Sequence, residues 1–324
     1  MSADTRPQPK TVLLAGATGY IGRAVAAQLV EAGYAVTAVL RSEAEVPSDI
    51  ETVVTDLTDA DALIQSLAGC HFDAVVSCIA SRTGASDDAW LVDHDANQHL
   101  LSLAKTVDAK HFVLLSAICV QRPRLAFQHA KLAFEESLAT SGLDYSIVRP
   151  TAYFRSLSGQ IKRVLADKPF LVFGDGQLTA CKPISESDLA NFMVDCLTNP
   201  DARNRILPIG GPGDPITPRE QGELLFRLTG KPEQFRRVPS SFLHWVAALL
   251  TPLGWFSRKM AVKAEFARIG HYYATESMLT WDEDANCYDG DATPSTGETT
   301  LQDHYETVLA EGIGVHAAGD QKLY

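Results

Sequence analysis

A glycine-rich turn between two apolar segments constrains the fold of this chain more than any other feature. The run Thr11–Ala15 is typical of a buried strand, and the next seven residues read GATGYIG. Apolar residues then recur at helical spacing over 21–32. Such glycines permit a tight turn, close approach of the backbone to a pyrophosphate, and close packing of helix on strand. The pattern predicts a dinucleotide site at the helix N-terminus, formed by Gly16, Thr18, Gly19, Tyr20, Ile21 and Gly22.

Strand-like and helix-like segments alternate over the first 150 residues. Further strands are expected at Ala35–Leu40, Glu51–Thr55, Ala74–Cys78, His111–Ser116 and Tyr145–Arg149, and helices at Asp59–Leu67, Asp88–Val107 and Leu125–Thr140. This alternation predicts an α/β fold with a Rossmann-type, doubly wound parallel sheet. We expect a disordered tail over 1–10, the dinucleotide-binding domain over 11–150, and a smaller C-terminal α/β lobe over 151–324. The lobe is expected to bind substrate and to return segments to the sheet.

The residue after the second expected strand indicates which dinucleotide binds. An acidic side chain there would bind the ribose 2′-hydroxyl of NAD, but neither Val39 nor Leu40 is acidic, and Glu43 lies beyond the strand end. Arg41 can instead pair with the 2′-phosphate of NADP, and Ser42 adds a hydroxyl donor. A solvated surface arginine is the alternative. The sequence therefore favours NADPH as the cofactor.

The carboxyl ends of the other strands supply further candidates, because ligands of open α/β sheets bind at that edge. Asp56 and Leu57 are expected at the adenine, and the segment from Cys78 to Ala80 is expected to line the cofactor. Additional cofactor-binding candidates are Ser116, Lys131, Pro150, Tyr153 and Phe154. The last two aromatic rings can wall the nicotinamide or stack on substrate, and core packing is the equal alternative.

Charge and composition narrow the classes of partner. The 324 residues carry a formal net charge of −12, which argues against nucleic acid because phosphate binding needs a basic face. The six cysteines include no C-x-x-C pair, so we expect neither a metal site nor a disulfide framework. No segment offers about 18 uninterrupted apolar residues, and the first ten contain no apolar leader core. We therefore expect no transmembrane segment and a cytoplasmic, bacterial-type chain without a transit peptide.

Several motifs resemble a known family. GATGYIG, Arg41, Ser116 and Val148–Pro150 resemble the atypical short-chain dehydrogenase/reductases, which include the NmrA-like proteins. Five later runs resemble the NADPH-dependent divinyl (proto)chlorophyllide 8-vinyl-reductases within that group: Phe173–Ala190, Leu207–Gly213, Thr217–Gly230, Tyr272–Asp282 and Asp291–Gly297. The resemblance extends from Thr11 to Gly312, and the later runs are its specific part. It implies reduction of the 8-vinyl group of a divinyl tetrapyrrole to ethyl, in chlorophyll or bacteriochlorophyll synthesis.

One departure from the wider superfamily bears on the chemistry. That superfamily uses a serine and a Tyr-x-x-x-Lys pair, but here Phe127 stands four residues before Lys131. A carbonyl reductase needs an acid at the developing alkoxide, whereas a conjugated vinyl group accepts hydride at carbon and spreads the charge into the ring. Phe127 therefore favours alkene reduction. Lys131 is expected to bind the nicotinamide ribose and Ser116 to lie at the sheet edge, with a surface lysine and a capping or turn hydroxyl as alternatives.

The expected lobe carries candidates for substrate binding. Cys181 can act as a proton source, although buried cysteine is more often packing, and Lys182 can pair with a tetrapyrrole propionate. Tyr272, Tyr273 and Glu276 are expected to shape the substrate site without assigned roles.

The run Phe242–Phe256 is rich in aromatic and aliphatic residues but too short to span a bilayer. The favoured interpretation is a buried lobe helix; a wall for the macrocycle and a peripheral membrane contact are the alternatives. Two other functions stay open for the whole chain. They are an NmrA-like NADP-binding redox sensor and an assembly factor without turnover.

Overall fold

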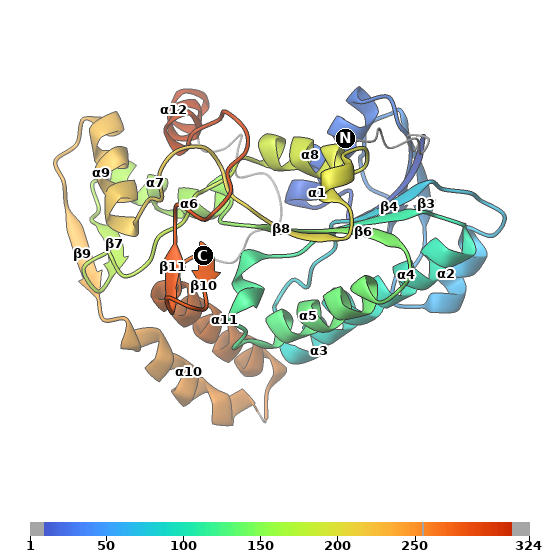
Figure 1. The fold of residues 1–324 in the computed structure, drawn as a ribbon. Helices are drawn as coiled ribbons and strands as arrows, with labels where there is room; N and C mark the ends of the chain where they lie inside the picture. Colours follow the sequence, from blue (N-terminus) through green and yellow to red (C-terminus); the bar gives the residue numbers. More distant parts are fainter. Residues whose placement is uncertain (1–9, 255, 313–324) are drawn as a thin grey trace. The chain divides into compact units, whose positions relative to one another are not determined.

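The computed structural model describes residues 10–254 and 256–312 (Figure 1). It divides into two compact units. The first comprises Met1–Arg149 and Leu189–Leu207, and the second comprises Pro150–Asp188 and Pro208–Tyr324. Of the tail predicted over 1–10, all but Lys10 lies outside the described residues.

A seven-stranded sheet organises the first unit, in the order β3-β2-β1-β4-β5-β6-β8. All pairs from β3 to β6 are parallel. The strands are β1 (Thr11–Ala15), β2 (Ala35–Leu40), β3 (Ile50–Val54), β4 (Ala74–Ser77), β5 (His111–Leu115), β6 (Asp144–Pro150) and β8 (Arg205–Ile209). The sequence order reverses beside β1, as the doubly wound fold requires. The predicted Rossmann-type α/β fold is confirmed.

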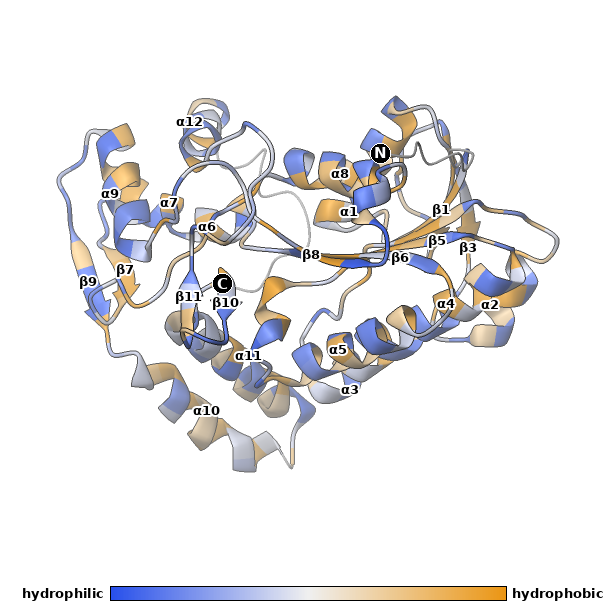
Figure 2. Ribbon diagram, in the orientation of Figure 1, coloured by the Kyte–Doolittle hydropathy of each residue, from blue (hydrophilic) through white to orange (hydrophobic). Residues whose placement is uncertain are grey.

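Helices cover both faces of this sheet. The helices are α1 (Tyr20–Glu31), α2 (Ala60–Ser66), α3 (Ser86–Ala89), α4 (Ala96–Thr106), α5 (Ala126–Ala139) and α8 (Glu186–Asp195). Figure 1 shows α1 on one face and α4 and α5 on the other. The central strands β1, β4 and β5 are mainly apolar because helices bury them from both sides, and β1 and β5 are largely orange in Figure 2. Phe112 of β5 and Phe134 of α5 pack with ring centroids 5.8 Å apart in this core.

The helix predicted over Asp88–Val107 is present but irregular. It runs without a break from α3 through a π-helical turn at Trp90–Asp95 into α4, and the π turn was not predicted. Asn97 holds the turn: its side-chain amide donates to the carbonyl of Asp93 at 3.0 Å and its Oδ1 accepts from Ser77 at 2.6 Å. A π turn adds one residue to a helix, and the regular spacing of apolar residues conceals it.

The second unit is built from smaller elements. Its helices are α6 (Phe154–Leu157), α7 (Ile161–Leu165), α9 (Pro218–Thr229), α10 (Ser241–Gly254), α11 (Arg258–Thr275) and α12 (Leu301–Glu311). Its strands form two pairs, parallel β7 (Phe170–Phe173) with β9 (Phe235–Val238) and antiparallel β10 (Thr280–Asp282) with β11 (Cys287–Asp289). Thr217 caps α9 in a reciprocal arrangement with Glu220, which is the favoured way to satisfy two unpaired helical N–H groups. A core of residues that includes Phe154, Leu225 and Tyr305 lies beneath these helices.

The run predicted as a buried lobe helix over Phe242–Phe256 does form a helix, α10, but the prediction that it is buried is wrong. In α10 only Ala247 is buried, and Trp245 and Leu249 are 69% and 72% exposed. Trp255 lies outside the described residues. The prediction failed because apolar composition alone does not say which face of a helix is covered. None of the helices within the described ranges is long and apolar enough to cross a membrane.

Candidate nucleotide and reaction site

The glycine turn between β1 and α1 has room for glycine alone at two positions. Gly16 has a φ of +87°, and a Cβ there would lie 2.7 Å from the carbonyl carbon of Cys78. A Cβ at Gly22 would lie 1.9 Å from the carbonyl oxygen of Gly16. Both distances are far below van der Waals contact, so the turn exists only because these side chains are absent.

The N-terminus of α1 is open to an anion. Gly19 is its N-cap residue and offers no side chain to accept from the first helical N–H groups. Thr18 and Gly19 are exposed, whereas Ile21 and Gly22 are buried against the sheet. Because a helix N-terminus carries a positive dipole end, this turn fits the pyrophosphate of a dinucleotide.

The predicted contacts for the adenosine half lie at the ends of β2 and β3. Arg41 and Ser42 are exposed directly after β2. Asp56 is exposed, and its pKa is lowered by hydrogen bonds from the backbone and hydroxyl of Thr58 and, to a lesser extent, by the charge of Arg41. Leu57 is 6% exposed and packs in the core. Arg41 is therefore close to Asp56 and available to a ligand, whereas the Leu57 side chain is not.

Lys131 is buried on α5 and forms an ion pair with Asp93. Its Nζ lies 3.0 Å from Asp93 Oδ1, which also accepts from the backbone N–H of Ser81 at 3.3 Å. The two residues are 8% and 1% exposed, which excludes the surface-lysine alternative. Asp93 Oδ2 is buried without a hydrogen-bond partner among the described residues. Because an unsatisfied buried carboxylate oxygen is costly, this atom indicates that a polar ligand completes the site.

Two other candidates belong near this ion pair: Cys78 is close enough to feel the charge of Lys131, and Phe127 precedes Lys131 by four residues. Cys78 follows β4, and burial raises the pKa of its thiol to about 12, although the charge of Lys131 acts in the opposite direction. The thiol is therefore neutral at physiological pH, so Cys78 can line the site but is a poor acid. Phe127 is half-buried one helical turn before Lys131 on α5. Ala80, also predicted at the cofactor, is exposed.

Ser116 is tied to a second buried ion pair. Its hydroxyl donates to the carboxylate of Glu135, and the guanidinium of Arg149 also donates to that carboxylate, with Nε 3.2 Å from each oxygen. Glu135 is 3% exposed. Ser116 is thus neither a helix cap nor a turn hydroxyl. While this bond holds, its oxygen can accept a hydrogen bond from a ligand but cannot donate one.

Two residues of this site were missed by the sequence analysis. Glu135 lies four residues after Lys131, and that spacing places both on one face of a helix, so the sequence did carry a signal for it. Asp93 carried none, because its inward position depends on the π turn.

In the second unit, Cys181 and Lys182 are adjacent and both buried. Burial raises the pKa of the Cys181 thiol to about 12, and its sulfur lies 3.9 Å from the Ile216 carbonyl oxygen and 3.9 Å from Gln221 Nε2. These contacts favour the packing alternative over a proton source. Lys182 Nζ donates to the carbonyl of Thr293 at 3.1 Å and also contacts a serine hydroxyl, with no carboxylate partner among the described residues.

The aromatic candidates are all buried or half-buried. Phe154 is 1% exposed and packs in the core, with its ring centroid 5.2 Å from that of His304, so the packing alternative holds for it. Tyr153 is half-buried, and Pro150 is buried at the end of β6. Of the residues without assigned roles, Glu276 is buried and accepts from the Tyr288 hydroxyl at 2.7 Å. Tyr272 is buried, with its ring edge-on to that of Tyr273.

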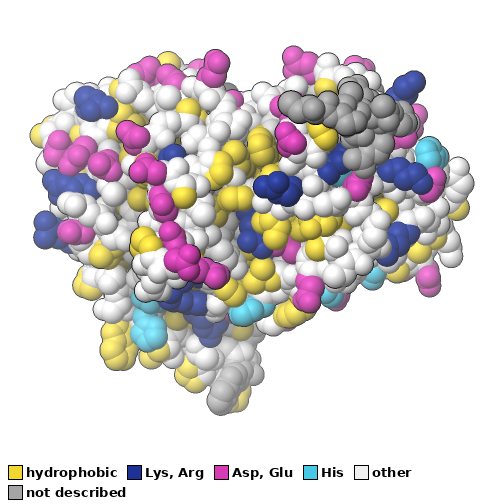
Figure 3. Space-filling model, in the orientation of Figure 1, with side chains coloured by type: hydrophobic (Ala, Val, Ile, Leu, Met, Phe, Trp, Pro, Cys, Tyr) yellow, Lys and Arg dark blue, Asp and Glu magenta, His cyan; other side chains and the backbone are white. Residues whose placement is uncertain are grey.

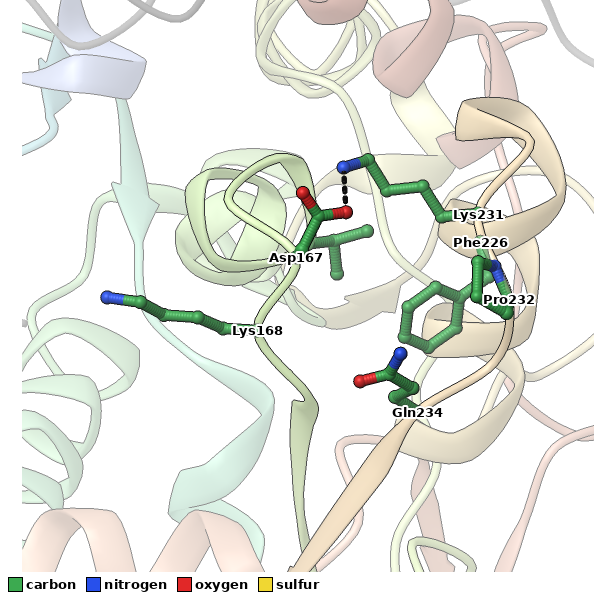
Figure 4. A pocket seen from close by; sticks show the side chains of 7 residues that line it. Asp167, Lys168, Phe226, Lys231, Pro232 and Gln234 are labelled. Atoms are coloured by element: carbon green, nitrogen blue, oxygen red, sulfur yellow. Dashed lines mark hydrogen bonds and ion pairs between the residues drawn. The ribbon is translucent and has the colours of Figure 1, made fainter.

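A small hollow on the second unit involves none of these candidates. Its volume is about 10 Å³, whereas small-molecule sites typically span roughly 300–1,000 Å³. An ion pair between Lys231 and Asp167 crosses its edge (Figure 4). The hollow is lined by Val164, Asp167, Lys168, Phe226, Lys231, Pro232 and Gln234. It is too small for a dinucleotide or a macrocycle.

Comparison with known proteins agrees with this geometry. A family described as NAD(P)H-binding matches residues 16–200. The divinyl chlorophyllide a 8-vinyl-reductase of Cucumis sativus is 45% identical, over 98% of this chain and 80% of that protein, and that of Zea mays is 46% identical, over 97% and 83%. Among solved structures, the NADPH complex of an Escherichia coli quinone oxidoreductase covers 92% of this chain and 99% of its own, with a TM-score of 0.66 and 17% identity. At that identity it shows a common fold.

These relatives overturn one expectation and establish the family. Both plant reductases are described as chloroplastic, so the prediction of a cytoplasmic, bacterial-type chain without a transit peptide is wrong. The family match and the glycine turn together establish a nicotinamide cofactor. With at least 45% identity along nearly its whole length to both reductases, the chain belongs to the divinyl chlorophyllide a 8-vinyl-reductase family.

Proposed function

We propose that this protein reduces the 8-vinyl group of a 3,8-divinyl chlorophyllide or protochlorophyllide to ethyl, with NADPH as the reductant. The observation that carries the proposal is the buried Lys131–Asp93 pair, which lies one helical turn from Phe127 rather than from a tyrosine. A phenol at that position would suit a ketone. Its replacement by a hydrocarbon suits a substrate that accepts hydride at carbon.

The chain's own residues bind and orient the reactants. The open N-terminus of α1 would bind the pyrophosphate, and Arg41 would pair with the 2′-phosphate. NADPH supplies the hydride when it is bound. Lys131 would donate to the nicotinamide ribose, and Oδ2 of Asp93, which has no partner among the described residues, would accept a hydrogen bond from a ribose hydroxyl. The cation at Lys131 also stabilises negative charge that develops on the substrate, since such charges act strongly where water is excluded.

Lys182 is the proposed partner of a substrate carboxylate. The residue is 9% exposed, and its ammonium is bound only by neutral oxygens among the described residues. A buried cation without a counter-ion is costly, so an anionic ligand group gains from binding beside it. The propionate of a chlorophyllide supplies such a group.

The proposal is tested by mixing the purified protein with NADPH and divinyl chlorophyllide and recording the absorption spectrum. Loss of a conjugated vinyl group shifts the Soret band to the blue, and one NADPH is oxidised and one proton taken up for each vinyl group reduced. NADPH binding without a spectral change would refute the proposal in favour of an NADP-binding sensor or an assembly factor.

A further inference from the structure

One side of α10 carries large apolar side chains that no described residue covers. They are Phe242, Trp245, Leu249 and Leu253, with Phe256 just beyond the helix, and their exposed fractions are 52%, 69%, 72%, 50% and 89%. Spacings of three and four residues place them along one side of a helix. We call these five residues the apolar stripe. Helices of globular proteins normally turn such a side inward, so the stripe requires an explanation.

The stripe is not the side by which α10 packs in the protein. The opposite side meets α11: Leu243 lies against Gly270, and Gly254 lies against Ala261. Thr251 also accepts a hydrogen bond from Arg268 of α11 at 2.8 Å. Because α10 already has this packing partner, its exposed side is available to a second one.

The charge around the stripe differs from that of the whole chain. The chain has a formal net charge of −12, yet no Asp or Glu occurs between Gln234 and Glu265. The cations of this segment are all exposed and lie at both ends of the stripe: Arg236, Arg237, Arg258, Lys259 and Lys263. Figure 3 shows dark blue side chains beside hydrophobic ones at the lower end of the view, where α10 and α11 lie.

We propose that the apolar stripe docks on the surface of a lipid bilayer that contains anionic lipids. An exposed apolar side flanked by cations is the chemistry by which a helix lies in the interface, with rings among the acyl chains and cations at the headgroups. With 14 residues, α10 is about 21 Å long, so it lies in the plane and does not span the bilayer. The proposal is independent of the proposed reaction.

Two other occupants fit the charges less well. A second copy of the chain, paired through the same surface by a two-fold axis, would bring identical cations face to face. A macrocycle against the stripe would use its rings, but its single carboxylate group would neutralise only one of Arg236, Arg237, Lys259 and Lys263. A surface of anionic lipid headgroups can neutralise all four.

The test is flotation of the full chain with vesicles. One set contains phosphatidylcholine alone, and the other contains phosphatidylcholine mixed with phosphatidylglycerol. We expect binding to the mixed vesicles that weakens as salt is added, because surface charges are screened. Failure of the wild-type chain to float with the mixed vesicles overturns the proposal.

Matched variants distinguish binding through the apolar stripe from nonspecific adsorption of the protein to vesicles. Trp245→Ser with Leu249→Ser is expected to weaken binding to the mixed vesicles by at least about tenfold. Leu178→Ser, at a residue that is 51% exposed outside the stripe, is expected to leave binding unchanged. Lys259→Ala with Lys263→Ala is expected to weaken binding about tenfold and to flatten its dependence on salt. Retained NADPH binding and helical circular dichroism show that each variant is folded.

Three results would contradict membrane docking. The stripe variant binding mixed vesicles as well as the wild type would do so directly. A wild-type dimer that the stripe variant converts to monomer, with vesicle binding unchanged, would assign the stripe to a second copy. A raised KM for the tetrapyrrole, again with vesicle binding unchanged, would assign it to substrate.

Discussion

At the level of single residues, substitutions in the Lys131–Asp93 pair can separate its contribution to catalysis from its contribution to stability. Lys131→Met leaves the Asp93 carboxylate buried without a counter-ion, which typically costs about 3–5 kcal/mol. We expect a lower free energy of unfolding and a loss of vinyl reduction of at least about a hundredfold. Urea unfolding and the spectral assay measure the two effects.

The double variant Lys131→Met with Asp93→Asn is the matched control. It removes both charges, so we expect stability to recover while activity stays low. Recovery of activity together with stability would show that the pair is only structural.

Gly22 offers a second test of the nucleotide site. In Gly22→Ala, the new Cβ would lie 1.9 Å from the Gly16 carbonyl oxygen, so the turn must open or α1 must shift. We expect NADPH binding, followed by its fluorescence, to weaken by at least about a hundredfold. Gly159→Ala is the control, because nothing lies within 4 Å of its added Cβ. Unchanged NADPH affinity in Gly22→Ala would remove the turn from the site.

Arg41 is expected to select NADPH over NADH. Arg41→Ala removes a charge-assisted contact to the 2′-phosphate, so we expect the KM for NADPH to rise by about tenfold to a hundredfold. The KM for NADH should stay within about twofold, since NADH has no phosphate there. Equal effects on both cofactors would mean that Arg41 acts through the fold, for example through its proximity to Asp56.

At the level of elements, Asp73 links the beginnings of two neighbouring strands in a way that depends on pH. Its carboxylate accepts from the backbone N–H groups of Lys10 and Thr11, at 2.8 and 2.9 Å, and from the Thr11 hydroxyl. Burial raises the pKa of this carboxyl, but the hydrogen bonds outweigh it and lower the pKa below the ordinary 3.8. A lowered pKa in the folded state stabilises the fold above the ordinary value.

We therefore expect part of the stability to be lost as pH falls from the ordinary pKa towards the lowered one. Asp73→Asn should be less stable near neutral pH and should lose less stability below about pH 4. Urea midpoints across this range measure both effects. Asp214→Asn, at an exposed residue, is the control, and a slope for Asp73→Asn as steep as that of the wild type would contradict the prediction.

The elements also show where prediction from the sequence succeeds and where it stops. Fully buried strands such as β1 follow from local patterns, so they were predicted within a residue or two. The π turn was not, because its hydrogen bonds involve Asn97 and Ser77, which lie twenty residues apart. The exposure of α10 was not predicted either. The sequence of an apolar helix is the same whether the side that faces away from α11 is covered by another part of the protein or open to solvent. Lys131 was found from its motif, whereas its partner Asp93 required the structure.

At the level of the whole molecule, the chain passes between its two units three times, after Arg149, Asp188 and Leu207. The segment that returns to the first unit is well anchored there. Ser146 of β6 donates to the Ala202 carbonyl at 2.8 Å, and Arg203 pairs with Asp144 at 2.9 Å. A cut at residue 150 would therefore remove the neighbour of β6.

We expect a fragment of residues 1–150 to be insoluble or to bind no NADPH, because β6 would become an unprotected edge. The full chain is the control, and NADPH fluorescence with size-exclusion chromatography measures the outcome. A soluble fragment with full NADPH affinity would show that the returning segment is dispensable for the nucleotide site.

The π turn between α3 and α4 has a consequence for how this site can be gained or lost. Removing one residue between Asp93 and α4 would restore an ordinary helix and rotate the part before the deletion by about 100° around the axis relative to α4. The carboxylate of Asp93 would then swing away from Lys131 while every other side chain kept its identity. A single-codon deletion can thus disable the pair, and a single-codon insertion can create one in a relative whose aligned residues otherwise look unchanged.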